Sequence, residues 1–185
     1  MKKLSFLLLL LVSGLAMAKP VSLKPEQVQL NWRGTKVTGE HVGAISLEAG
    51  SIVLGKNGLV ESGELVVNMD SITCTDLEGE WRDKLINHLK DKDFFDTKNH
   101  KTANLKIKNI VDNKGQKEAI ADLTIKGITK PVRFPVTQEK NSYKGKMVFN
   151  RVDYQITYNS GSILKNLGDK MIHDNVEVSF EVNLK

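Results

Sequence analysis

The sequence predicts a mainly β domain of antiparallel strands with one amphipathic helix. Three observations predict it. Apolar residues recur at every second position over much of the chain, Asn and Gly residues separate these runs, and a single segment follows the helical period instead. Many short antiparallel strands in one domain are typical of a barrel or a sandwich. We favour the barrel, because closure of a sheet leaves no unpaired edge strand.

The first 18 residues have the pattern of a cleavable signal peptide. Two lysines, Lys2 and Lys3, precede a leucine-rich run at 4–15, and Ala-Met-Ala at 16–18 places small residues at the −3 and −1 positions of a cleavage site. The apolar run is shorter than the ~20 residues of a membrane span, so a retained membrane anchor is the weaker interpretation. We expect residues 19–185 to form one exported domain.

The chain is mildly basic, with a formal net charge of +5, and removal of the signal peptide would take away two of its lysines. The lysines are scattered among apolar residues and form no basic stripe, which argues against nucleic-acid binding. A transient contact with an anionic membrane surface is compatible with this charge.

Cys74 is the only cysteine and forms no internal disulfide; we expect a buried, inert thiol rather than an intermolecular bridge.

Period-two alternation gives each predicted strand one apolar face. The faces at 63–69, 119–125, 143–149 and 176–184 are the clearest, and they include Leu65, Val67, Leu123, Ile125, Met147, Phe149, Val178 and Phe180. The predicted strands are 27–37, 41–49, 51–55, 58–70, 103–111, 118–126, 131–139, 143–150, 152–158 and 175–184.

One segment breaks this period. Apolar residues recur every four positions over 76–90, which predicts an amphipathic helix with Thr75 or Asp76 as its N-cap. Gly79 weakens the first turn of that helix. The apolar stripe consists of Leu77, Trp81, Leu85 and Leu89. A second, shorter helical piece is predicted at 162–167.

Two adjacent aromatic rings, Phe94 and Phe95, follow this helix within a charged loop. They could pin the lone helix to the β domain as a hydrophobic plug, or they could roof a cavity together with the helix. The pattern does not separate these two interpretations, which are also compatible with each other.

The sequence contains no recognisable catalytic or metal-binding motif. His41, His88, His100 and His173 have no metal-ligand spacing, and one cysteine cannot complete a zinc site. Acid and base partners can meet from distant strands, so an enzyme remains an open alternative. A closed barrel of about eight strands can hold one small ligand, and an apolar lining favours an apolar one.

Four stretches carry a resemblance to a known family. They are WRGTKVTGEHVG at 32–43, RDKLINHLKDKDFFD at 82–96, ADLTIKGITKPVRFPV at 121–136 and FNRVDYQI at 149–156. In order and spacing they are similar to the motifs of the YceI-like proteins, a family of bacterial periplasmic proteins. Each stretch alone is a weak signal, whereas four in order are fairly specific.

The resemblance implies a lipocalin-like antiparallel β-barrel in the periplasm, with a long apolar pore that binds a polyisoprenoid chain such as an isoprenoid quinone or a polyprenyl lipid. It implies no catalytic residues, no metal and no cofactor beyond that bound ligand. Neither the resemblance nor the pattern separates a monomer from a homodimer.

A ligand site follows from the resemblance and the strand faces together. Trp81, Leu85, Leu89, Phe94 and Phe95 are predicted to hold the helix and its following loop over the barrel and to reach the ligand. The eight strand residues named above supply the rest of the predicted lining. His41, Arg151 and Asp153 are interpreted as fold-forming residues rather than ligand contacts, and Arg82 with Asp83 as a structural polar contact.

Three function classes remain open from the sequence. The leading one is a carrier or scavenger of isoprenoid lipid. The second is an enzyme acting on a lipid or quinone in the same cavity, which needs a buried polar cluster deep in the barrel. The third is a stress-related partner-binding scaffold, which predicts a filled interior and an exposed apolar patch.

Overall fold

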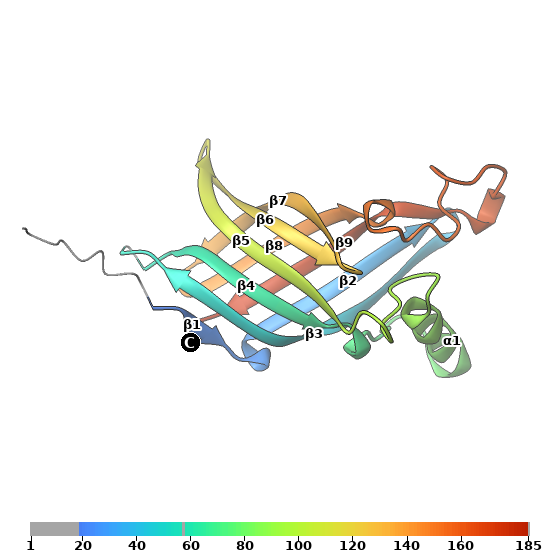
Figure 1. Cartoon of the computed structure of the whole chain (residues 1–185), viewed down its shortest axis with the longest axis horizontal. Helices are drawn as coiled ribbons and strands as arrows, with labels where there is room; N and C mark the ends of the chain where they lie inside the picture. The colour runs from blue at the N-terminus through green and yellow to red at the C-terminus, as the bar shows by residue number, and fades with distance from the viewer. Residues whose placement is uncertain (1–18, 57, 185) are drawn as a thin grey trace, which may run out of the picture.

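The computed structural model describes residues 19–56 and 58–184, which form an antiparallel β-barrel (Figure 1). The predicted signal peptide at 1–18 lies outside the described residues. The strands are β1 (Val21–Leu23), β2 (Val28–Lys36), β3 (Gly39–Leu54), β4 (Val60–Asn68), β5 (Thr102–Asn113), β6 (Gln116–Ile125), β7 (Ile128–Glu139), β8 (Ser142–Asn150) and β9 (Ile172–Asn183).

The long strand β3 closes the barrel. Its first part pairs with β2, from Lys36↔Gly39 to Leu30↔Ile45, and its second part pairs with β4, from Ser46↔Asn68 onward. The strand order β3-β2-β9-β8-β7-β6-β5-β4 therefore returns to β3, and β1 adds to the end of β3 outside this ring of eight. The predicted antiparallel barrel is confirmed, and the described residues contain one α-helix.

The two strands predicted at 41–49 and 51–55 are one strand, β3. Gly50 lies inside it and pairs with Leu65. A Cβ atom at Gly50 would lie 3.0 Å from a Leu65 methyl group and 3.3 Å from a Leu47 methyl group, so glycine here leaves room for apolar side chains and does not form a turn. A bulge between Leu47 and Ala49 lets the strand bend where it changes partners.

The helix α1 (Gly79–Lys90) confirms the predicted helix but begins three residues later. Gly79 has a φ of +54°, a left-handed conformation that glycine adopts without strain. The predicted caps Thr75 and Asp76 are wrong, since Glu78 occupies the N-cap and its side chain makes no capping bond. Among the described residues, no helix has the length and apolar character to cross a membrane.

Two other predicted elements are wrong. The strand at 152–158 is replaced by the 3₁₀ helix η3 (Arg151–Tyr154) and a turn, in which Gln155 has a φ of +59°. The helical piece at 162–167 is a loop, followed by the 3₁₀ helix η4 (Gly168–Lys170). Two further 3₁₀ turns are η1 (Pro25–Gln27) and η2 (Met69–Ser71).

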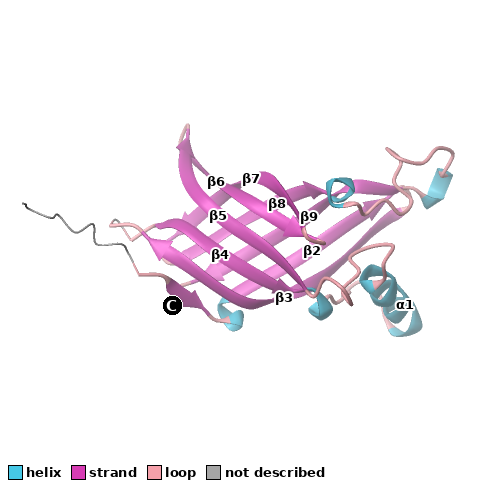
Figure 2. Ribbon diagram, in the orientation of Figure 1, coloured by secondary structure: helices cyan, strands magenta, loops and turns pink. Residues whose placement is uncertain are grey.

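The two ends of the barrel differ (Figure 2). The end that we call the α1 end carries the β2–β3 turn, the excursion 69–101 with α1, and the loop 151–171. Direct bonds hold these parts together, because Val37 N donates to Met171 O at 3.2 Å and His41 Nδ1 lies 2.8 Å from Asp76 Oδ2. The opposite end carries β1 and the short turns between β3 and β4, β5 and β6, and β7 and β8.

Candidate functional site

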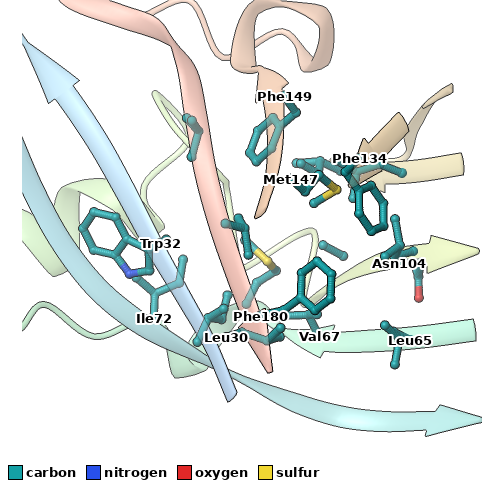
Figure 3. A pocket seen from close by; sticks show the side chains of 18 of the residues that line it. Leu30, Trp32, Leu65, Val67, Ile72, Asn104, Phe134, Met147, Phe149 and Phe180 are labelled. Atoms are coloured by element: carbon teal, nitrogen blue, oxygen red, sulfur yellow. The ribbon is translucent and has the colours of Figure 1, made fainter. Parts of the chain in front are cut away.

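An apolar cavity runs through the barrel (Figure 3). The space open to the centres of water-sized molecules is about 260 Å³, whereas one buried water needs only ~10–15 Å³ by the same measure. Protein interiors are normally close-packed, so a void of this size is a feature of the fold rather than a packing defect. The scaffold interpretation predicted a filled interior, and the cavity contradicts that expectation.

The apolar strand faces predicted from alternation point into this cavity. The predicted residues that line it come from β4, β6, β8, β9, α1 and the loop after α1: Leu65, Val67, Leu123, Ile125, Met147, Phe149, Val178, Phe180, Leu85, Leu89, Phe94 and Phe95. Figure 3 shows several of them directed toward one another across the open space. Their position on the wall is established by the structure, and their contact with a ligand stays a prediction.

Trp81 does not line the cavity, and the prediction that it helps to hold α1 over the barrel is wrong. Its side chain is 71% exposed, and the Lys84 ammonium lies 4.9 Å from the centre of its ring. The physical reason is the length of the helix. Leu85 and Leu89 reach the cavity from the C-terminal half of α1, while the first turn projects beyond the barrel (Figure 1).

Several lining residues were not singled out from the sequence, although the same alternation marks them. Leu30 and Trp32 on β2, Leu105 and Ile107 on β5, and Phe134 on β7 all face inward. Each lies in a predicted strand, so the inner faces of 27–37, 103–111 and 131–139 could have been assigned by the period-two rule.

Buried apolar side chains line the cavity at the end opposite α1. Leu23, Val28, Ile52 and Val60 are each buried there. Tyr143 is also buried and uses its hydroxyl to accept a hydrogen bond from Val60 N at 3.2 Å. This end therefore surrounds an apolar chain with mainly apolar side chains.

The α1 end is the polar mouth of the cavity. Its lining includes Thr35 and Lys36 at the end of β2, His41 on β3, Arg151 on η3 and His173 on β9. Lys36 and His173 are exposed, which places water at this end of the cavity. A ligand with one polar end would lie with its apolar chain toward β1 and its polar end at this mouth.

Phe94 closes part of the mouth and also lines the cavity. It is 7% exposed, and its ring lies 4.8 Å from His88 on α1 and 5.4 Å from Tyr158 on the loop 151–171. His88 and Tyr158 are themselves 4.6 Å apart. The three rings tie the excursion 69–101 to the loop 151–171, so the plug and the roof interpretations both describe Phe94.

Phe94→Ala is expected to destabilise the protein by about 3 kcal/mol, because a buried ring is lost and little can collapse into its place. Urea unfolding of the ligand-free protein measures this change. Phe95→Ala is the matched comparison, since Phe95 is only partly buried, and should cost clearly less. Equal unfolding midpoints for Phe94→Ala and the wild type would contradict the plug role.

The segment 73–76 is fastened to β3 beside the mouth. Thr73 N donates to Ala44 O and Thr75 N to Val42 O, each at 2.9 Å. Trp32 Nε1 donates to Thr73 O at 2.9 Å. A Cβ atom at position 43 would overlap the Thr73 carbonyl oxygen, so Gly43 is required for this close crossing.

Asp76 completes this fastening. Its carboxylate accepts hydrogen bonds from Val42 N at 2.9 Å, from His41 Nδ1 at 2.8 Å and from Cys74 Sγ at 3.2 Å. Burial raises the pKa of Asp76, but these hydrogen bonds outweigh it, and the net pKa is lowered. Burial, followed by the bond to Asp76, raises the pKa of the Cys74 thiol, which fits the expected buried, unreactive cysteine.

Asp76→Asn is expected to lower stability in a pH-dependent way. Because the pKa of Asp76 is lower in the folded state than its unfolded value of ~3.9, the ionised carboxylate stabilises the fold above that value. This contribution is lost as pH falls through the folded pKa. Melting temperatures across pH should therefore show the largest gap between wild type and variant above about pH 5, and the gap should narrow as the pH falls below about 4. A gap independent of pH would contradict the role of the carboxylate.

Arg151 binds backbone carbonyl oxygens at the mouth and also lines the cavity, and its interpretation as a fold-forming residue rather than a ligand contact stays a prediction. Its guanidinium is buried and donates to the carbonyl oxygens of Ile156, Ile172 and His173 at 2.9, 3.0 and 3.2 Å. Asp174 lies 3.3 Å away in an ion pair. Residues 152–158 form no strand, and these hydrogen bonds from Arg151 satisfy carbonyl oxygens there and fix the loop 151–171 to β9.

The other polar residues singled out from the sequence lie at the surface. Asp153 is exposed; burial, with a smaller effect of Asp153, raises the pKa of the adjacent buried Tyr154 to about 12. Arg82 Nε donates to Asp83 at 3.2 Å, so the predicted contact exists, but on the exposed side of α1. Within residues 19–56 and 58–184, His, Cys, Asp and Glu side chains form no group of three or more that could hold a metal ion.

Comparison with known proteins identifies relatives of this chain. The sequence model of the YceI-like domain matches residues 22–184. No curated protein matches. The solved structure of BcnA from Burkholderia cenocepacia is similar with a TM-score of 0.66 at 18% identity, covering 88% of this chain and 99% of that one.

Two further solved structures share the fold. A polyisoprenoid binding domain from Saccharophagus degradans, implicated in plant cell wall breakdown, is similar with a TM-score of 0.58 at 15% identity, covering 88% of this chain and 97% of that one. The YCEI protein of Campylobacter jejuni is similar with a TM-score of 0.53 at 15% identity, covering 100% of this chain and 91% of that one. At these identities the similarity establishes the fold alone.

Proposed function

Because this chain belongs to the YceI-like family, we propose that it is a lipid-binding protein that holds a polyisoprenoid chain inside its barrel. The observation that carries the proposal is the cavity, whose walls are mainly apolar and whose charged and imidazole side chains lie at the α1 end. An elongated apolar chain with a polar end matches that arrangement.

The energetics of burial support a long ligand. Each CH₂-sized group moved from water into an apolar cavity is worth about 0.8 kcal/mol, and an isoprene unit brings several carbons. A few units therefore outweigh the entropy lost when a flexible chain is ordered. The similar domain from Saccharophagus degradans is described as polyisoprenoid binding, which supports the same ligand class here. An isoprenoid quinone or a polyprenyl lipid would satisfy it.

The proposed place of action is the periplasm, reached through the signal peptide predicted at 1–18. A polyisoprenoid cannot cross water unaided, so a barrel that encloses it would serve as a carrier or a scavenger, without catalysis and with no cofactor besides the bound ligand. Either a monomer or a homodimer could do this. Loading and release imply a transient contact with a membrane surface.

A fluorescence titration tests the proposal. The chain has two tryptophans; Trp32 lines the cavity and Trp81 is exposed, so Trp81→Phe leaves Trp32 as the only indole. Adding an isoprenoid quinone should quench Trp32 saturably, with one ligand per chain. The same headgroup without its prenyl chain is the control and should not bind. Unsaturable quenching, or equal quenching by both compounds, would contradict binding in the barrel.

A further inference from the structure

Exposed apolar side chains gather at the mouth of the cavity. Four large ones stand in three segments at the α1 end: Val37 in the β2–β3 turn is 50% exposed, Trp81 on α1 71%, and Ile163 and Leu164 in the loop 151–171 are 53% and 45% exposed. We call these four residues the apolar rim. Single exposed apolar residues are ordinary, but a set that surrounds one opening indicates an interaction surface.

The rim is built on ordered backbone. Val37 N donates to Met171 O at 3.2 Å, which joins the β2–β3 turn to the loop 151–171. Ile163 N and Leu164 N both donate to Ser160 O, at 3.2 and 2.8 Å. Ser162 Oγ donates to Asp174 Oδ2 at 2.6 Å and fixes this turn to β9. The tips that carry Ile163 and Leu164 are therefore presented outward by a fixed scaffold.

The rim is continuous with the cavity wall along α1. Leu89 and Leu85 line the cavity, and Trp81 lies one further turn along the same i, i+4 stripe, outside the barrel. The helix thus provides an apolar track that begins inside the cavity and ends at an exposed indole. A purely structural helix would place this stripe against the protein along its whole length.

The charges around the rim suit an anionic surface. Lys36, Lys165 and Lys170 are exposed and, among the described residues, form no ion pair, while Asp169 is the acidic residue between the last two. On α1, Lys84 pairs with Glu80 at 2.8 Å and Arg82 with Asp83 at 3.2 Å, and the N-cap Glu78 is exposed without an ion pair among the described residues. Around the rim, three unpaired lysines therefore outnumber two unpaired acidic residues, Asp169 and Glu78.

We propose that the apolar rim docks this protein on a lipid bilayer with anionic headgroups, so that the mouth of the cavity opens onto the membrane. Trp81, Ile163 and Leu164 enter the interface, where tryptophan is favoured, and the three lysines meet the headgroups. The inference rests on the proposed lipid ligand, because an apolar chain leaves the barrel most readily where an apolar phase meets the mouth.

Vesicle binding tests the docking surface. The probe is vesicles of phosphatidylethanolamine and phosphatidylglycerol, and the measurement is co-sedimentation of ligand-free protein. The double variant Ile163→Ser/Leu164→Ser should bind about tenfold more weakly than wild type, because two apolar side chains are lost from the interface. Val148→Ser is the matched control: Val148 is 45% exposed on the barrel wall, away from the rim, and its loss should leave vesicle binding unchanged.

A second readout reports on Trp81 directly. Vesicles whose acyl chains carry bromine should quench Trp81 in the wild type, and Trp81→Phe should remove that quenching. Quinone binding by the rim variants should match wild type, since none of the substituted residues lines the cavity. Wild-type protein that ignores the vesicles, or rim variants that bind them as well as wild type, would overturn the docking surface even if quinone binding stands.

Discussion

Val178→Trp is expected to block ligand binding while leaving the barrel folded. Val178 lies midway along β9, faces the cavity, and pairs with Trp32 on one side and Met147 on the other. An indole here occupies the space of roughly one isoprene unit, and the loss of about 0.8 kcal/mol per displaced CH₂-sized group predicts at least a hundredfold weaker binding. Because Val178 borders a cavity and not a close-packed core, the melting temperature of the ligand-free protein should hold or rise.

The matched control places the same side chain on the opposite face of the wall. Val148→Trp adds an indole at an exposed position of the neighbouring strand β8 and should bind ligand as the wild type does. Titration of an isoprenoid quinone against both variants measures the contrast. Equal affinities for Val178→Trp and Val148→Trp would mean that the ligand does not occupy the cavity.

Arg151→Met is expected to cost about 3–5 kcal/mol of stability. The substitution keeps the aliphatic stem but removes the donors that satisfy the carbonyl oxygens of Ile156, Ile172 and His173, and it leaves Asp174 without its ion-pair partner. Buried polar groups without hydrogen-bond partners destabilise the folded state. Burial lowers the pKa of Arg151, and the nearby charge of Asp174 opposes this shift without cancelling it.

Arg133→Met controls for the loss of an arginine as such. Arg133 pairs with Glu118 at 3.3 Å on the barrel surface, with a side chain that is 63% exposed, and exposed pairs of this kind are worth at most about 1 kcal/mol. Urea unfolding of the two variants should separate clearly. A similar, small loss in both would show that the Arg151 bonds do not hold the loop 151–171.

The inner faces of the barrel were predictable because burial follows the geometry of a strand. Alternation at Leu65 and Val67, or at Leu123 and Ile125, identifies the strand face that is buried on folding. Closure of the sheet into a barrel turns this apolar face toward the interior. The helix was predictable for the same reason, from its own period. These signals are local, so the buried face can be assigned without knowledge of which strands pair.

The parts that could not be predicted depend on bonds between distant segments. The segment 73–76 is bound to β2 as well as to β3, because Trp32 Nε1 on β2 donates to the Thr73 carbonyl oxygen, and this bond leaves no periodic mark in the sequence. Apolar and polar residues alternate at 152–156 as they would in a strand. The segment forms a turn instead, because the buried Arg151 side chain needs carbonyl oxygens as hydrogen-bond acceptors. For Trp81, the helical period identifies the stripe but not how far α1 extends beyond the barrel.

The most direct test of the central claim is mass spectrometry of an organic extract. The full chain, with its own predicted signal peptide, would be expressed in a bacterium, purified from the periplasm without detergent and extracted. The account predicts a polyisoprenoid at nearly one per chain, whose mass gives the chain length and the headgroup together, and which Val178→Trp lacks. Protein that carries no such lipid and also takes up no added isoprenoid quinone would contradict the account.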